Sequence, residues 1–316
     1  MNLAMIPTAD RNLPAIAGLM AKCPDSEIIK YAPERRCIIR VVRQGRTYYA
    51  KIYPPKFLKR GRGEGIDEIG RVFWELAEAG ELNFNVARPA GWDAAAAAVW
   101  CEELIGSPAV EILRSGSGEG IVYGIGKAIS LIAKSRIEPK RIFDYAEQLK
   151  DTAEFAEILL NKFPALTATV EFLFKRLETV YLPEKQLVPT HGDMHIDQWL
   201  INGNELGLLD FEDVSLGHPE RDLAFFTVQL ESEYGTELDY ATLNAHLIEG
   251  YKSIGSQPNE RLINIYAANK WFSKASKANN VYLSKELLRR AGNCLETYDS
   301  FFVESSALRR NNRLYR

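Results

Sequence analysis

The sequence lacks any run of about 18 consecutive apolar residues, the length that a membrane-spanning helix requires. It also lacks a secretory leader pattern, because prolines and charged residues interrupt positions 7–14. Cysteine is scarce, and its four positions are too far apart for a CxxC metal site and too few for a disulfide framework: Cys23, Cys37, Cys101 and Cys294. These absences predict a soluble, cytoplasmic protein with reduced thiols and no membrane partner.

A large excess of charge is absent as well, since 39 basic and 42 acidic residues give a formal net charge of -3. Proteins that coat nucleic acid gain affinity by neutralising phosphates with Lys and Arg, so no nucleic-acid partner is expected. What the sequence does contain is 46% apolar and 26% charged residues over 316 positions, the composition of an ordinary globular protein. This length permits two lobes that each bury a core, and the sequence gives no indication of an oligomeric state.

The early part of the chain carries strand patterns. Two runs rich in Ile, Val and Tyr lie within residues 37–53 and flank Gln44-Gly45, which predicts a β-hairpin. Residues 66–80 then place apolar side chains at i, i+3 and i+4, which predicts a helix ending at Gly80.

The strand-rich part is expected to end near Glu103. Residues 87–106 give mixed signals, because five alanines favour helix whereas the flanking Pro, Gly and aromatic residues favour strand, and we predict a strand. Beyond about residue 107 the apolar spacing is mostly helical. We therefore predict an N-terminal lobe at 1–103 and a helical C-terminal lobe at 104–316.

Histidines, acids and amides gather around two apolar runs in THGDMHIDQWLINGNELGLLDFED, residues 190–213. Its two short apolar runs flank an Asn-Gly-Asn-Glu turn at 202–205, which predicts an antiparallel hairpin. A hairpin in this register places Gln198 opposite Leu209, one residue from Asp210. An amide oxygen and a carboxylate would thus lie at the same end of the hairpin.

Hard oxygen donors at that position suit Mg²⁺, which is typically bound by one or two carboxylates together with water and substrate phosphate. A further carboxylate, Asp193, lies in the preceding loop and is a candidate base. Phosphoryl transfer needs this division, in which one acid orients the attacking hydroxyl and others hold the metal that neutralises developing charge.

The segment from His191 to Ala224, with HGDMHIDQ, the hairpin and LDFEDVSLGHPERDLA, resembles the aminoglycoside phosphotransferase and choline kinase superfamily. The family pattern is HGDxHxxN, a hairpin and (I/L)DF(E/D)xxxxGxPxxDLA. The resemblance implies that Asp193 is the catalytic base, that Asp210 binds magnesium, and that Asp222 supports the loop.

The same resemblance implies an α+β fold like that of protein kinases, with a small antiparallel β-rich N-lobe and a large, mainly helical C-lobe. It implies ATP and Mg²⁺ as cofactors. The implied reaction is transfer of the γ-phosphate to a hydroxyl of a small polar acceptor, namely a sugar, an aminoglycoside or an amino alcohol.

Gln198 departs from the family pattern, which usually has Asn as the second metal ligand. Glutamine offers the same amide oxygen on a stem that is one methylene longer. Bacterial maltokinases are similar here, with HGDxHxxQ followed by a DFE segment. Gln198 and Asp210 are therefore the expected metal ligands.

The upstream region is expected to supply the nucleotide site. In a kinase-like small lobe a strand lysine holds the phosphates and a helix glutamate holds that lysine. YYAKIY places Lys51 at the position that the resemblance implies. DEIGRVFWEL resembles the family's helix pattern, in which a glutamate precedes Arg by three residues, and this favours Glu68 as its partner over Glu64 and Glu75. The segment that contacts adenine is expected at the end of the strand-rich part, at Cys101, Glu102 and Glu103.

The phosphate-covering loop fits the kinase pattern poorly, because YAPERRCIIRV contains no glycine. Arg35 and Arg36 are hypothesised to bring positive charge to the phosphates instead. His191 and His195 are interpreted as residues that shape the turn rather than as catalysts.

Two other functions remain open. A metal-dependent hydrolase would use a cluster formed by His191, Asp193, His195 and Asp197, but only His218 and His246 remain to complete it. A nucleotide-binding pseudokinase would bind ATP without turnover. The acids within 229–240 are candidates for receiving a cationic acceptor or for a solvated face, and the sequence does not decide between them.

Overall fold

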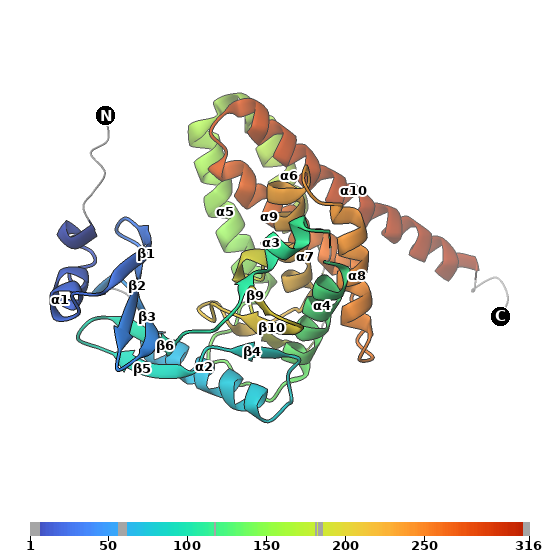
Figure 1. Ribbon diagram of the computed structural model, residues 1–316. Coiled ribbons are helices and arrows are strands. Elements are labelled where there is room, and N and C mark those ends of the chain that lie inside the picture. Colours follow the sequence, from blue (N-terminus) through green and yellow to red (C-terminus); the bar gives the residue numbers. More distant parts are fainter. Residues whose placement is uncertain (1–6, 56–61, 117, 181, 183–185, 312–316) are drawn as a thin grey trace. The chain divides into compact units, whose positions relative to one another are not determined.

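Contacts within the chain group its residues into two compact units (Figure 1). The first comprises Met1–Ala109 and Asp197–Glu212, and the second comprises Val110–Ile196 and Asp213–Arg316. The first unit is thus discontinuous in sequence, while the lobe boundary after residue 103 stays a prediction. This computed structural model describes residues 7–55, 62–116, 118–180, 182 and 186–311.

The strands of the described residues are short. They are β1 (Glu27–Ala32), β2 (Arg36–Arg43), β3 (Arg46–Ile52), β4 (Phe84–Val86), β5 (Pro89–Asp93), β6 (Ala98–Glu102), β7 (Ser107–Pro108), β8 (Val188–Thr190), β9 (Trp199–Asn202), β10 (Glu205–Leu208) and β11 (Ser215–Gly217). The helices are α1 (Ala15–Lys22), α2 (Arg62–Glu78), α3 (Ala109–Arg114), α4 (Glu119–Lys134), α5 (Tyr145–Lys162), α6 (Thr167–Glu178), α7 (Glu220–Tyr234), α8 (Tyr240–Lys252), α9 (Glu260–Lys277) and α10 (Val281–Asn311). None of these described helices has the length and apolar character needed to cross a membrane.

A five-stranded antiparallel sheet of order β1-β2-β3-β6-β5 forms the body of the first unit. The predicted hairpin is confirmed, and its turn residues Gln44 and Gly45 have φ of 50° and 74°, as a type I′ turn requires. Helix α2 packs against β4, β5 and β6. It ends as predicted, with Gly80 at φ 71° and its N–H donated to Ala77 O at 2.9 Å.

The segment 87–106 forms two strands, β5 and β6, joined by a turn that contains most of the alanine run. Asp93 Oδ1 accepts hydrogen bonds from the N–H groups of Ala95 at 3.0 Å and Ala96 at 3.1 Å. Ala97 takes a φ of 48°. The strand prediction is confirmed, and the alanines form a turn that is held by the Asp93 side chain.

The second hairpin, formed by β9 and β10, also belongs to the first unit. Asn202 pairs with Glu205, so the loop has only two residues, with Gly203 at φ 61°. Leu209 N donates to Gln198 O at 2.9 Å, which confirms the predicted register. β10 also pairs in parallel with β4, which ties the hairpin to the N-terminal part of the chain.

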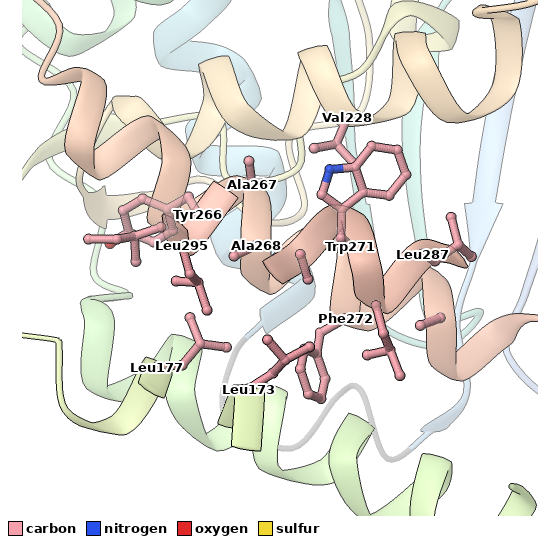
Figure 2. Packing of buried hydrophobic residues seen from close by; sticks show 14 of the residues in the cluster. Leu173, Leu177, Val228, Tyr266, Ala267, Ala268, Trp271, Phe272, Leu287 and Leu295 are labelled. Carbon is pink, nitrogen blue, oxygen red and sulfur yellow. The ribbon is translucent and has the colours of Figure 1, made fainter. Parts of the chain in front are cut away.

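The second unit is mainly helical, which confirms the predicted α+β organisation. Side chains from its helices form one buried cluster, which contains Tyr266, Trp271 and Phe272 of α9 together with Leu173 and Leu177 of α6 (Figure 2). Helices α4 and α8 approach closely: a Cβ on Gly126 would lie 1.9 Å from Leu247 O. Helices α7 and α9 of this core contact the loop that follows β8 and ends at Ile196.

Candidate active site

Asp210 follows β10 and lies in a group of charged side chains at the end of the hairpin. Lys51 Nζ lies 2.9 Å from Asp210 Oδ1 and also forms an ion pair with Glu212. Tyr53 donates its hydroxyl to Glu212 Oε1 at 2.5 Å. Arg36 Nη1 lies 3.8 Å from Asp210 Oδ2. We name these five residues the acid cluster.

The conformation of the acid cluster is set locally. Asp210 has a φ of 71°, a left-handed value that is uncommon outside glycine and often marks functional positions. The ring of the next residue, Phe211, stacks on Phe73 of α2 with centroids 4.5 Å apart. Burial and the neighbouring Glu212 raise the pKa of Tyr53 well above its usual value, so its hydroxyl remains a donor.

Two neighbouring carboxylates of helix α2, Asp67 and Glu68, differ in burial. Glu68 lies on the exposed side of the helix, and Lys51 takes its carboxylate partners from residues 210–212 among the described residues. Asp67 is 9% exposed and binds Arg71 through Oδ2, while its Oδ1 has no hydrogen-bond partner within the described residues. The pairing of Glu68 with Lys51 stays a prediction, and Asp67 is a carboxylate that the sequence reasoning missed.

The expected adenine segment lies at the end of β6. Burial raises the pKa of the Cys101 thiol to about 11, despite the opposing effect of Lys51. The N–H groups of Glu102 and Glu103 donate to Arg88 O at 2.8 Å and Thr47 O at 3.0 Å. These two donors are engaged within the first unit, and the assignment of Cys101, Glu102 and Glu103 to adenine contacts stays a prediction.

The glycine-free turn between β1 and β2 is held by a residue from the N-terminal segment. Asp10 Oδ2 accepts hydrogen bonds from Glu34 N at 2.7 Å and from the Tyr31 hydroxyl at 2.9 Å. Glu34 takes a φ of 61°, which a glycine would adopt more easily. Arg35 in this turn is exposed, whereas Arg36 is the arginine that reaches the acid cluster.

In the second unit, the loop that begins at His191 is fixed by a buried carboxylate. Asp222 is 1% exposed and accepts hydrogen bonds from His191 N at 2.7 Å and Gly192 N at 2.8 Å. Burial raises the pKa of Asp222, and these contacts oppose the increase. A Cβ on Gly192 would lie 2.2 Å from Asp213 O, so only glycine fits. The supporting role expected for Asp222 is confirmed by these contacts.

Asp193 lies in the same loop and is more accessible than Asp222, with 43% of its side chain exposed. Lys270 Nζ of α9 lies 2.9 Å from Asp193 Oδ1 and 4.1 Å from the Phe225 ring centroid. Burial raises the pKa of Asp193, but Lys270 and the neighbouring His195 outweigh this effect and hold it below its usual value. The base candidate is thus ionised and has a fixed cationic neighbour.

Two residues of this region were missed by the sequence reasoning. Lys270 follows the loop by 77 positions, and Gln229, which is 6% exposed, accepts a hydrogen bond from Ile196 N at 3.0 Å. The apolar spacing of α7 and α9 marks these positions only as helical. No local signal indicates that they contact the loop.

The side chains proposed for a transition-metal site are not arranged as one in the described part of the chain. No group of three or more His, Cys, Asp or Glu residues there is placed to hold a metal ion. The two remaining histidines are engaged elsewhere: His218 Nδ1 shares a hydrogen bond with the Tyr266 hydroxyl at 2.7 Å, and His246 faces Glu119 at 3.6 Å. These contacts count against the hydrolase alternative.

The oxygen donors expected for magnesium fit that ion by type. Gln198 offers an amide oxygen and Asp210 a carboxylate, and the Gln198–Leu209 hydrogen bond brings their backbones together at the hairpin end. Gln198 is 4% exposed. Both ligands are hard oxygen donors, and their number is small. This is typical of Mg²⁺ sites in which substrate phosphate oxygens complete the coordination.

A family model described as "Phosphotransferase enzyme family" matches residues 39–255 of the sequence. A comparison with curated proteins finds no match. Among solved structures, the chain is similar to amicoumacin kinase hAmiN in complex with AMP-PNP, Ca²⁺ and Ami, with 13% identity, 87% of this chain and 89% of that chain covered, and a TM-score of 0.59.

Two further solved structures are similar in the same way. Choline kinase LicA from Streptococcus pneumoniae has 16% identity, 87% and 94% coverage of this chain and that chain, and a TM-score of 0.57. An aminoglycoside-3′-phosphotransferase of type VIII has 20% identity, 83% and 99% coverage, and a TM-score of 0.58. At such identities the likeness shows the fold, which is the two-lobed, kinase-like α+β fold expected from the sequence.

Proposed function

Because this chain belongs to the phosphotransferase enzyme family and is a small-molecule phosphotransferase, we propose that it moves the γ-phosphate of ATP to a hydroxyl of a small polar acceptor. Asp193 is the catalytic base in this proposal. Gln198 and Asp210 hold Mg²⁺, and Lys51 binds the nucleotide phosphates. Sugars, aminoglycosides and amino alcohols are the acceptor classes it includes.

The observation that carries the proposal is the 2.9 Å contact between Lys51 and Asp210, which are 159 positions apart in sequence. A strand lysine beside the carboxylate that follows a hairpin is the arrangement that nucleotide phosphates and their metal need in kinases. The ion pair keeps both groups ordered before nucleotide binds. Lys51 then exchanges a carboxylate partner for phosphate oxygens.

The chain's own residues divide the chemistry between them. Bound magnesium would neutralise charge on the phosphates. Asp193 orients the acceptor hydroxyl and accepts its proton as the hydroxyl oxygen attacks the γ-phosphorus and ADP leaves. Asp222 keeps Asp193 in place by holding the backbone of the loop, and Arg36 adds positive charge near the leaving phosphates.

Replacing Asp193 tests this assignment. Asp193→Asn should lower acceptor-stimulated ADP release at least about a thousandfold while ATP affinity is retained, because the amide can still accept a hydrogen bond but cannot take the proton. Release is measured with a coupled assay and affinity by calorimetry with ATP and magnesium. Asp197→Asn is the matched control, since Asp197 is exposed in the same segment. Near-normal turnover in Asp193→Asn would refute the role.

A pseudokinase remains the second candidate, favoured by the glycine-free turn between β1 and β2. Both candidates bind nucleotide, so turnover alone separates them. ATP consumption with any acceptor that disappears in Asp193→Asn eliminates the pseudokinase. Nucleotide binding without turnover across sugars, aminoglycosides and amino alcohols would favour it.

A further inference from the structure

The charges around Asp193 are balanced by side chains of the second unit itself. Three ion pairs involve α7, α9, α10 and the loop: Asp193–Lys270 at 2.9 Å, Glu231–Arg290 at 2.5 Å and Glu233–Lys274. Each carboxylate in these pairs is matched by one cation. These three carboxylates are therefore already paired with cations of the same unit before any acceptor arrives.

The remaining acids of the 229–240 segment are also engaged. Glu237 accepts from Arg114 Nε at 2.7 Å, and Asp239 caps α8 by accepting from Thr242 N at 3.2 Å. The sequence offered this segment either as a receptor for a cationic acceptor or as a solvated face. Its four acids instead bind partners within the protein, so the segment gives no support to a cationic acceptor.

The two partners of the Asp193–Lys270 ion pair differ in exposure. Only 17% of the Lys270 side chain is exposed, against 43% for Asp193, so the ammonium is fixed while the carboxylate remains accessible. The Phe225 ring lies 4.1 Å away and favours the charged ammonium through its negative face. A fixed charge that is largely shielded from water acts more strongly on nearby groups than a solvated one.

We propose that Lys270 makes the site selective against cationic acceptors, so that the acceptor is an uncharged sugar rather than an aminoglycoside or an amino alcohol. This inference rests on the proposed function, in which the reacting hydroxyl meets Asp193. An amine close to that hydroxyl would approach the Lys270 ammonium, and it would compete with Lys270 for the same carboxylate. A hydroxyl without a nearby amine meets neither obstacle.

Binding measurements test the role of Lys270 without requiring turnover. Kanamycin is titrated by calorimetry into the protein with ADP and magnesium, using the original chain, Lys270→Gln and Lys277→Gln. Lys270→Gln should bind kanamycin about tenfold or more tightly, because Asp193 then lacks its internal cation. Lys277→Gln, a matched change at an exposed residue of the same helix, should have no effect.

A double substitution isolates the pair. In Asp193→Asn/Lys270→Gln the gain in kanamycin affinity should disappear, because no unpaired carboxylate remains. Lys270→Met, checked by circular dichroism for folding, serves as a second variant. If the unsubstituted protein binds kanamycin as tightly as Lys270→Gln and Lys270→Met do, the proposal is overturned.

Turnover separates this inference from the function on which it rests. Acceptor-stimulated ADP release is compared for glucose and maltose, which are uncharged, and for glucosamine, choline and kanamycin. Release with the uncharged sugars above that with glucosamine supports the inference, and a preference for a cationic compound overturns it. Absence of release with every compound counts against the phosphotransferase proposal, while the kanamycin titration still decides the role of Lys270.

Discussion

The acid cluster of the first unit and the Asp193 loop of the second unit hold their carboxylates in different ways. In the acid cluster, Asp210 and Glu212 share the ammonium of Lys51 through ion pairs between side chains. In the loop, the buried carboxylate of Asp222 binds backbone N–H groups, and Asp193 is partly exposed. Side-chain pairs can exchange partners when a charged ligand arrives, whereas backbone contacts are part of the fold.

The largest effect should come from breaking the backbone contacts of the second unit. Asp222→Ala leaves the N–H groups of His191 and Gly192 buried without an acceptor, and we expect a loss of roughly 3 kcal/mol or more in the free energy of unfolding. Urea denaturation measures it. Asp239→Ala, which removes an exposed helix cap, should cost only about 1 kcal/mol. Similar losses in the two variants would show that the buried contacts of Asp222 to the loop contribute no more than an exposed cap.

Asp210→Ala should change the free energy of unfolding little and nucleotide affinity strongly. The Asp210 side chain is 26% exposed and forms an ion pair with the Lys51 side chain, so the free energy of unfolding should change by less than about 1 kcal/mol. Magnesium-dependent nucleotide affinity should fall about 10- to 100-fold, since one expected ligand is lost. Calorimetry with and without magnesium measures this. Asp213→Ala is the control, and an unaltered magnesium dependence in Asp210→Ala would contradict the metal assignment.

The smallest expected effect is a shift in the pH dependence of kcat/KM when the cation beside Asp193 is removed. Burial raises the pKa of Asp193, whereas Lys270, His195 and His191 lower it, and the net result is a lowered pKa. The base works when ionised, so activity falls as the pH drops through this pKa. Lys270→Met removes the main lowering contribution, which raises the pKa and moves the acidic limb to higher pH. An unmoved limb would show that Lys270 does not tune the base.

Local signals in the sequence predicted the elements that carry the candidate site. Gln44-Gly45 and Asn202-Gly203 supply the backbone conformations that tight turns need, so both hairpins and the Gln198 register followed from neighbouring residues. The end of α2 at Gly80 followed for the same reason. The family pattern then selected Asp193, Asp210 and Asp222 from among the many acids.

Partners from distant parts of the chain could not be predicted in this way. Lys270 and Gln229 lie on helices whose apolar spacing says nothing about which loop they contact. Asp10 fixes the turn at Glu34 across 24 positions. Helix α2 illustrates a finer limit, because the spacing indicates a helix but does not show whether Asp67 or Glu68 lies on the buried side.

The parallel pairing of β10 with β4 has a consequence for synthesis of the protein on the ribosome. The first unit needs residues up to Glu212 of 316, although its other part ends at Ala109. Translation proceeds at about 5–20 residues per second, so β4 waits several seconds for its partner strand to emerge. During that interval its edge is open, and the nascent N-terminal part depends on the rest of the growing chain, or on a chaperone, to avoid pairing with another molecule.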